Sequence, residues 1–505
     1  MPPRLGYTAP SEWISSMDTK PAVGGASPLG LGRPEREQSA APDSGAAKSL
    51  SSHGWGAEFG ALFKLGWPLM VAQLAQISLN TTDVVMLGWL GPKYLAAAAL
   101  ASALFVALQL FGMGIVEAVA PMVAQALGAR DYRSVRRTVR QGIWAGILVA
   151  LLLVPVAWNI APIYRWLGQN EELIGMAERF VHYAVWLIFP AFQIIVFRSF
   201  LSAHGSTRVI LLITIAGFFV NAFCDWLLIF GNWGIPRLDL AGAGIATTAT
   251  NIAMLGFTIA YTLWHRRYRR YHIFHNFFRA DWPRFRELFR IGMPIGVMRL
   301  AEVLLFTSAA LLQGWLGEDE VAAHAIALQL ASISFMVPLG ISQAATVRVG
   351  LALGEHDREG IRRAGWMALV VTLLFMAATA IAFLLVPGPL VGLFLNPANS
   401  ANIHAIGLAT SYLIVAGFFQ LFDGTQVTMS AALRGLSDTK MPLVIALVGY
   451  WLVGFPISYL FGFPLGLRGV GIWMGLAAGL AAVGLVLTLR WAMRERLGLT
   501  THPPV

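Results

Sequence analysis

The sequence predicts an all-α polytopic membrane protein, with twelve transmembrane helices in two six-helix lobes related by a parallel internal repeat. Three observations predict this fold. Hydrophobic residues make up 57% of the 505 residues and charged residues only 12%, and a mean hydropathy of +0.65 exceeds what a water-soluble core can bury. Apolar stretches of about 20 residues alternate with short polar loops. Motifs of the first half recur in the second half at a fixed offset.

The apolar stretches define the expected helices, because about 20 apolar residues are needed to cross a bilayer as a helix. In the first lobe we expect helices near 59–87, 95–121, 136–158, 177–203, 207–231 and 239–264. In the second lobe we expect helices near 286–314, 321–348, 362–386, 403–433, 439–462 and 467–490. Polar or basic loops bound each stretch.

The domain organisation follows from these stretches. We expect a disordered cytoplasmic N-terminal tail over residues 1–56, because Gly, Pro, Ser and Ala dominate it and apolar periodicity is missing. The remaining units are an N-terminal lobe over 57–264, a basic cytoplasmic linker over 265–285, a C-terminal lobe over 286–491 and a short cytoplasmic tail over 492–505. The N-terminal tail lacks the apolar core of a signal peptide, and translation could start at Met1 or at Met17.

Basic residues determine the expected orientation. They gather in every second loop, as in Arg130–Arg140, Arg266–Arg290 and Arg490–Arg496, whereas the opposite loops carry acids such as Glu171 and Glu318. Since cytoplasmic loops are enriched in Lys and Arg, we expect both termini in the cytoplasm. The same distribution argues that the net charge of +10 reflects loops at a membrane surface and not nucleic-acid binding.

The two halves repeat with an offset of 226 residues. Pro68 recurs as Pro294, and the stretch Gly128-Ala129-Arg130-Asp131 recurs as Gly354-Glu355-His356-Asp357. Because six helices is an even number, the two copies share one orientation and form a parallel repeat about an axis along the membrane normal. This architecture is typical of secondary transporters, although a duplicated bundle without transport activity would show the same pattern.

Ionisable residues inside the apolar stretches are candidate functional residues, because burying them in the bilayer core is costly. Counted from the basic-loop ends of their helices at about 1.5 Å per residue, Asp83, Asp225 and Thr247 lie about 28, 25 and 27 Å deep. Asn221 lies one turn from Asp225 on the same helix face. Two carboxylates, an amide and a hydroxyl supply oxygen ligands for Na⁺ or a shared proton site, or else they are structural polar groups.

The second lobe offers Glu302 and Asp423, which lie about 18 Å and about 16 Å from the basic ends of their helices and therefore near the midplane. Arg299 precedes Glu302 by three residues on the same face and could neutralise it. Glu117 and Arg198 lie near cytoplasmic helix ends, where we expect their side chains to reach out to the interface. The histidines lack metal-ligand spacing, and Cys224 is the single cysteine, so no disulfide or cysteine-rich metal site is expected.

These residues resemble the multidrug and toxic compound extrusion (MATE) family, in its NorM-like branch, over about Ala57 to Arg496. The matching motifs are Asp83 with Met86-Leu87-Gly88, Pro121-Met122-Val123-Ala124-Gln125-Ala126-Leu127-Gly128-Ala129, Asn221 with Asp225, Glu302 with Val321-Ala322-Ala323-His324, Pro338 to Gly350, Asp423-Gly424-Thr425-Gln426 and Leu433 to Thr439. The most specific of them is the stretch from Pro338 to Gly350.

The resemblance implies a secondary active transporter of the bacterial inner membrane, which exports cationic amphiphilic compounds in exchange for Na⁺ or H⁺. It implies coupling roles for Asp83, Asn221, Asp225 and Thr247 in the first lobe, and for Glu302 and Asp423 in the second. No cofactor is expected beyond the coupling ion, with Na⁺ at these residues as the one metal. Small organic cations and the lipid bilayer are the expected partners, and we expect a functional monomer.

Two other classes fit parts of the sequence. The major facilitator superfamily also has a six-plus-six repeat, but its loop motif needs a second Gly where Val135 stands. A membrane-embedded lipid-modifying enzyme would need a large extramembrane loop or a catalytic cluster. The longest internal loop, Trp264 to Arg290, contains Asp281 and Glu287 as its only acids, which argues against an enzyme.

The charge asymmetry of the loops gives the first testable prediction. Single cysteines in a Cys224→Ala background, placed in residues 264–290 or near either terminus, should react with an impermeant thiol reagent only from the cytoplasmic side, because basic loops remain there. Cysteines beside Glu171 or Glu318 are the control and should react only from outside. Reaction of either terminus from outside would contradict the predicted topology.

Overall fold

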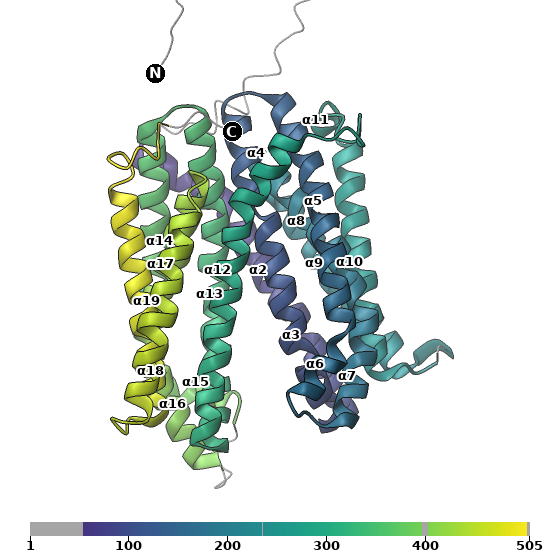
Figure 1. Cartoon of the computed structure of the whole chain (residues 1–505), viewed down its shortest axis with the longest axis vertical. Coiled ribbons are helices and arrows are strands. Elements are labelled where there is room, and N and C mark those ends of the chain that lie inside the picture. The colour runs from purple at the N-terminus through teal and green to yellow at the C-terminus, as the bar shows by residue number, and fades with distance from the viewer. Residues whose placement is uncertain (1–53, 235, 396–401, 502–505) are drawn as a thin grey trace, which may run out of the picture. The chain divides into compact units, whose positions relative to one another are not determined.

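The computed structural model describes residues 54–234, 236–395 and 402–501, and most of these residues are helical. The expectation of disorder for residues 1–56 falls almost entirely on residues outside this part of the chain. The described residues form the two predicted lobes. Figure 1 shows α3–α10 gathered on one side and α14–α19 on the other, with the axes of the long helices roughly aligned.

The first lobe contains the six predicted spans, two of which are interrupted. Its elements are α2 (Trp55–Leu90), α3 (Pro92–Val116), α4 (Val119–Gly128), α5 (Tyr132–Trp158), α6 (Ile160–Trp166), α7 (Glu171–Ala184), η1 (Val185–Leu187), α8 (Ile188–Ala203), α9 (Thr207–Phe230), η2 (Asn232–Gly234) and α10 (Asp239–Trp264). The helices α3 and α4 together form the second span, and α7, η1 and α8 together form the fourth.

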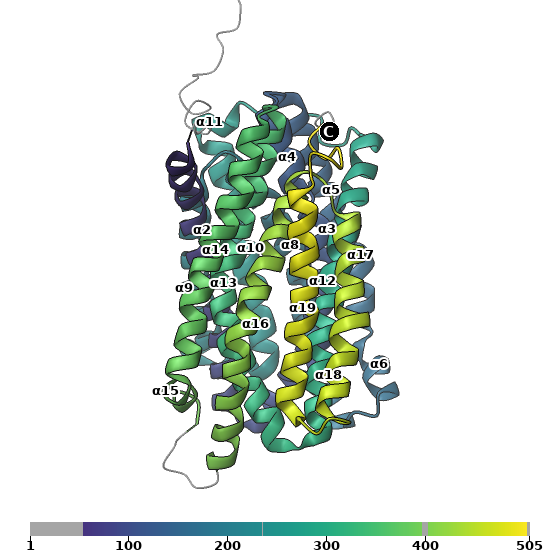
Figure 2. The ribbon, with the colours of Figure 1, turned by 90° about the vertical axis from the view of Figure 1, so that its left-hand side faces the viewer.

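The second lobe follows the short helix α11 (Arg266–Arg269). Its elements are α12 (Trp282–Leu316), α13 (Glu318–Gly354), α14 (Arg358–Leu385), α15 (Pro387–Gly392), α16 (Ile403–Gly435), α17 (Lys440–Leu447), η4 (Val448–Gly454), α18 (Phe455–Gly462) and α19 (Arg468–Ala492). The eleventh span is interrupted, since η4 is a π-helical segment between α17 and α18. In Figure 2 the helices α14, α16 and α19 of this lobe run side by side.

Eleven of the twelve predicted spans coincide, within the described residues, with helices long and apolar enough to cross a membrane. The first span, α2, has the length but carries a series of polar residues that lowers its hydropathy: Gln73, Gln76, Asn80, Thr81, Thr82 and Asp83. Polar residues in a membrane helix are tolerated where they face protein or a cavity. Of these polar residues Gln73 is buried, whereas Gln76, Asn80 and Thr81 are exposed.

The repeat is visible in how the lobes pack. Helix α2 of the first lobe packs against α13 of the second, and its repeat counterpart α12 packs against α3, the counterpart of α13. Helix α4 also packs against α13. A two-fold relation gives each interface contact such a counterpart. The parallel repeat predicted from the offset of 226 thus describes the interface between the lobes.

The repeated Gly-x-x-Asp stretch has the same structural role in both copies, at the interface between the lobes. A Cβ on Gly128 would lie 2.2 Å from the carbonyl oxygen of Leu351, and a Cβ on Gly354 would lie 2.1 Å from that of Gln125. Only glycine permits so close an approach. Three residues later, Asp131 accepts a hydrogen bond from the Ser134 backbone amide and caps α5. Its counterpart Asp357 caps α14 in the same way.

The basic linker packs against the first lobe. The Arg137 side chain of α5 forms an ion pair with Asp281 at 2.5 Å, and the indole nitrogen of Trp144 donates to the carbonyl oxygen of Phe277 at 3.0 Å. These contacts hold the linker at the end of the molecule where α4 and α19 also end (Figure 1). Both predicted cytoplasmic faces, that of the linker and that of the C-terminal segment, therefore lie at one end.

The glycine crossing gives the second testable prediction. Gly354→Ala places a methyl group against a backbone oxygen, so α4 and α13 must move apart. Overpacking of this kind costs about 1–3 kcal/mol, and we expect a lower melting temperature for the detergent-solubilised protein.

Gly256→Ala is the matched control, because a Cβ there meets nothing within 4 Å and alanine favours the helix. Its melting temperature should stay equal or rise. An unchanged melting temperature for Gly354→Ala would contradict the close crossing.

Candidate functional site

The four residues predicted for the first lobe converge on one point. Asp83 lies on α2, Asn221 and Asp225 lie one turn apart on α9, and Thr247 lies on α10. The Asn221 side-chain amide donates to Asp83 Oδ1 at 2.5 Å and to Asp225 Oδ2 at 2.6 Å. The Thr247 hydroxyl lies 3.3 Å from Asp83 Oδ2. We call these four residues the first-lobe cluster.

The first-lobe cluster has the chemistry of a cation site. Asn221 and Asp225 are fully buried, and Asn221 Oδ1 and Asp225 Oδ1 are buried without a hydrogen-bond partner among the described residues. The salt bridges of the described chain include neither Asp83 nor Asp225, although the two carboxyl groups interact with each other. Buried carboxylates without a positive partner are costly. A proton or an oxygen-ligated cation such as Na⁺ would supply the missing charge.

Small residues allow the three helices to meet. A Cβ on Gly242 of α10 would lie 2.6 Å from the carbonyl oxygen of Leu228 on α9, so glycine permits the close approach of these two helices. Asn251, one turn beyond Thr247 on α10, donates to the Thr247 backbone oxygen at 2.8 Å. The approach brings Thr247 within reach of Asp83 on the third helix.

The two acids predicted for the second lobe also face each other, but without a direct bond. Asp423 on α16 is 5% exposed and interacts electrostatically with Glu302 on α12. In the described chain neither carboxyl group has a hydrogen bond or an ion pair. We call Glu302 and Asp423 the second-lobe pair. Both side chains are therefore available to a proton or cation.

Tyr450 is a neighbour of the second-lobe pair that the sequence reasoning missed. It lies fully buried in the π-helical segment η4, interacts electrostatically with Glu302 and Asp423, and accepts a hydrogen bond from the Gln426 side chain at 2.7 Å. π-helical turns within α-helices occur frequently at functional sites. Hydropathy carries no signal for such a turn, so the sequence could not mark this tyrosine.

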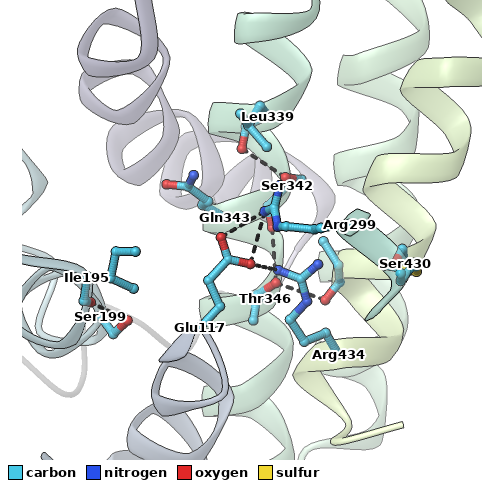
Figure 3. Close-up of polar contacts among 12 residues, drawn as sticks. Glu117, Ile195, Ser199, Arg299, Leu339, Ser342, Gln343, Thr346, Ser430 and Arg434 are labelled. Atoms are coloured by element: carbon cyan, nitrogen blue, oxygen red, sulfur yellow. Dashed lines mark hydrogen bonds and ion pairs between the residues drawn. The ribbon is translucent and has the colours of Figure 1, made fainter. Parts of the chain in front are cut away.

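The sequence left open whether Arg299 neutralises Glu302; in the structure Arg299 forms its hydrogen bonds with Glu117, although it still interacts electrostatically with Glu302. Arg299 Nη2 donates to the two carboxylate oxygens of Glu117 at 2.7 and 2.9 Å. Arg434 Nη1 donates to the same carboxylate at 2.8 Å. In Figure 3, dashed lines join the Glu117 carboxylate to both guanidinium groups. Glu302, one turn further along α12, is left without an ion pair among the described residues.

The expectation that Glu117 and Arg198 reach out to the interface is wrong. The Glu117 side chain is 17% exposed and paired across the lobes. Arg198 Nη2 donates to the side-chain oxygens of Gln73 at 2.9 Å and of Gln343. Both residues have partners within the protein, which satisfy their charges better than the distant interface does.

Arg348 is the last residue of the helix expected over 321–348, but it does not lie at a helix end. Helix α13 extends to Gly354, so Arg348 lies inside it and is 6% exposed. Its guanidinium group pairs with the buried carboxylate of Glu58 at the start of α2. Neither residue stood out as a candidate, because each lies close to a helix end in the sequence. Their partnership depends on the packing of α2 on α13.

The polar contacts between the lobes share one location. They join Glu117 to Arg299 and Arg434, Glu58 to Arg348, Arg198 to Gln343, and Gln125 to Gly435 and Ser437. All of them involve the basic-loop halves of their helices. Elsewhere in the described chain, ion pairs such as Lys93–Glu172 and Arg468–Glu320 join residues of a single lobe. The lobes are therefore closed against each other at the basic-loop end.

Comparison with known proteins agrees with this architecture. The family model MatE matches residues 68–227 and 294–460, one stretch in each lobe. The chain is 43% identical over 445 residues to a Mesorhizobium japonicum protein described as "Probable multidrug resistance protein NorM", covering 88% of this chain and 95% of that protein. A Brucella suis protein with the same description is 44% identical over 439 residues, covering 86% and 93%.

A solved structure has the same fold. It is described as "Outward-facing conformation of a multidrug resistance MATE family transporter of the MOP superfamily". The two chains superpose with a TM-score of 0.78 at 20% sequence identity, and the match covers 90% of this chain and 98% of that one. At this identity the likeness concerns the fold alone.

Proposed function

The chain belongs to the MatE family of membrane transporters, and on this premise we propose that it exports cationic amphiphilic compounds in exchange for Na⁺ or H⁺. It is a multi-pass membrane protein and a multidrug efflux antiporter, not an enzyme. The first-lobe cluster is the observation that supports coupling of export to a cation or proton. Its two carboxylates are bridged by one amide and lack a positive partner in the described chain.

In this proposal the coupling ion neutralises acids that the protein leaves without a partner. Asp83 and Asp225 take a proton or Na⁺ in the first lobe, with Asn221 and Thr247 as further oxygen ligands. Glu302 and Asp423 share a second proton or cation, since two nearby carboxylates in a dry site do not both ionise easily. Mixed oxygen ligands of this kind suit both ions.

Export requires that the ion and the drug favour different conformations of the same molecule. The contacts between the lobes close the basic-loop end, so with basic loops in the cytoplasm this conformation is the one that admits ions from outside. An organic cation entering from the cytoplasm competes for the same negative charge. We propose the bacterial inner membrane as the location, cytoplasmic termini, and a functional monomer.

Ion-driven transport gives the third testable prediction. In everted vesicles the wild-type protein should accumulate a fluorescent organic cation when a Na⁺ or proton gradient is imposed, each gradient being tested alone. Asp83→Asn should lower the initial rate on the order of tenfold or more, the effect of losing about 1.4 kcal/mol of ion binding.

Asp319→Asn is the control, because Asp319 is an exposed acid with a surface ion pair, and such pairs contribute little. Its rate should equal that of the wild type. Full transport by Asp83→Asn under both gradients would refute a coupling role for the cluster, and no accumulation by the wild type under either gradient would refute the antiport.

The second-lobe pair gives the fourth testable prediction. If Glu302 and Asp423 share one proton or cation, Glu302→Gln and Asp423→Asn should each reduce transport, and the double variant should be no worse than either single variant. The measurement is the initial rate in the same vesicles, corrected for protein content. Independent losses that add up in the double variant would contradict a shared site.

A further inference from the structure

Arg299 interacts electrostatically with two carboxylates that belong to different lobes. Its Nη2 atom donates to both carboxylate oxygens of Glu117 in the first lobe, at 2.7 and 2.9 Å. Arg299 also lies three residues before Glu302 on α12, so both side chains share one helix face. The Arg299 guanidinium group therefore takes part in a contact between the lobes and also interacts with a proposed ion-binding carboxylate.

The hydrogen bonds of Arg299 are incomplete in the observed conformation. Its Nε atom is buried and has no hydrogen-bond partner among the described residues. Glu302, one turn away, has no ion pair in this part of the chain either. Arg299 thus forms its ion pair with Glu117, whereas Glu302, the nearest carboxylate along α12, has no ion pair.

We propose that Arg299 exchanges partners during transport, pairing with Glu117 while the basic-loop end is closed and with Glu302 when that end opens. The inference rests on the proposed exchange of an ion for the drug. When the lobes separate at this end, Glu117 moves away with the first lobe. A buried guanidinium group left without a partner is strongly destabilising. Glu302 moves together with Arg299, because both belong to α12.

The exchange of partners would link opening of the basic-loop end to binding of the ion. In the closed conformation Glu302 is free to bind the ion that enters from outside. In the open conformation Arg299 supplies a positive charge to Glu302 and displaces the ion on the basic-loop side. The ion then binds the two conformations with different affinities, which is the condition for it to shift their equilibrium.

Arg434, the second partner of Glu117, also interacts electrostatically with Glu302, but it belongs to a different helix from that acid and is therefore placed less well for this role. It lies on α16, eleven residues from Asp423 (434 − 423), which corresponds to about 16 Å along the helix. It therefore cannot take Asp423 as a substitute partner within its own helix. Arg299 is the arginine with a free acid one turn away.

The Arg299–Glu117 ion pair has no ion pair as its counterpart in the other copy of the repeat. At the offset of 226, Arg299 corresponds to Gln73 and Glu117 corresponds to Gln343. These two glutamines are neutral, and both accept from Arg198. The counterpart contact thus contains the charge of Arg198 but no arginine–carboxylate pair that could exchange partners.

The test measures opening of the basic-loop end. Ala344 on α13 is fully buried and lies against α2, since a Cβ on Gly66 would lie 3.6 Å from the Ala344 Cβ. In a Cys224→Ala background, Ala344→Cys should react with an impermeant maleimide from the cytoplasmic side only when the lobes separate. The reaction rate in everted vesicles is measured with and without the ion, Na⁺ or protons, that drives transport in the assay above.

We expect the ion to slow labelling of the otherwise wild-type protein several-fold, because it favours the closed conformation. Arg299→Gln should bring the ratio of the rates without and with ion towards one. Arg299→Lys keeps the charge and should retain part of the ratio. Arg348→Gln is the matched control: it breaks another contact between the lobes and should speed labelling while leaving the ratio unchanged.

A wild-type ratio in Arg299→Gln would overturn the partner exchange. Loss of the ratio in Arg348→Gln as well would also overturn it, because the effect would then follow from any loosening of the interface. An otherwise wild-type protein that transports in the vesicle assay but shows no ion effect on labelling would overturn the exchange while leaving the proposed function intact.

Discussion

A charge buried between apolar helices is stable only when an opposite charge or several hydrogen bonds reach it, and this constraint sorts the acids of the molecule. Glu58 and Glu117 have arginine partners from the other lobe. Asp83 and Asp225 share an amide, and Glu302 has no direct bond in the described chain. These paired acids join the lobes, whereas in the proposed function the others bind a proton or cation from solution. Burial alone does not distinguish the two kinds of acid; their partners do.

The two copies of the internal repeat share the same close backbone contacts but carry charged residues at different positions. Gly128 and Gly354 cross the partner helix at matching places, where an added Cβ would lie 2.2 and 2.1 Å from a carbonyl oxygen, and Asp131 and Asp357 cap equivalent helices. By contrast, Glu302 corresponds to Gln76 at the same offset. A steric contact tolerates only glycine, so both copies must keep it. A charge is constrained only by its partners, so the two copies can place different acids on one frame.

Sequence reasoning predicted the twelve spans, the repeat and the convergence of Asp83, Asn221, Asp225 and Thr247, because hydropathy and helical rise determine depth along each helix. It did not predict partners across the interface. Glu117 and Arg299 are 182 residues apart, and their contact depends on how α3 packs on α12. Depth along a helix gives no information about rotation around it or about which helix lies opposite. The same gap explains why the pairing of Arg348 with Glu58 was not predicted and why Tyr450 was overlooked.

The first helix of each lobe carries both a proposed ion-binding acid and a contact between the lobes. Helix α2 carries Asp83 in its C-terminal half and Glu58 near its N-terminal end, while α12 carries Glu302 one turn from Arg299. Each helix also contains a proline, Pro68 or Pro294, which removes a backbone hydrogen bond where the helix can bend. In the proposed mechanism, neutralising an acid on such a helix alters the forces on an element that also holds the lobes together at the basic-loop end. Ion binding and opening of that end are then coupled within a single helix, over one turn in α12 and over most of the length of α2.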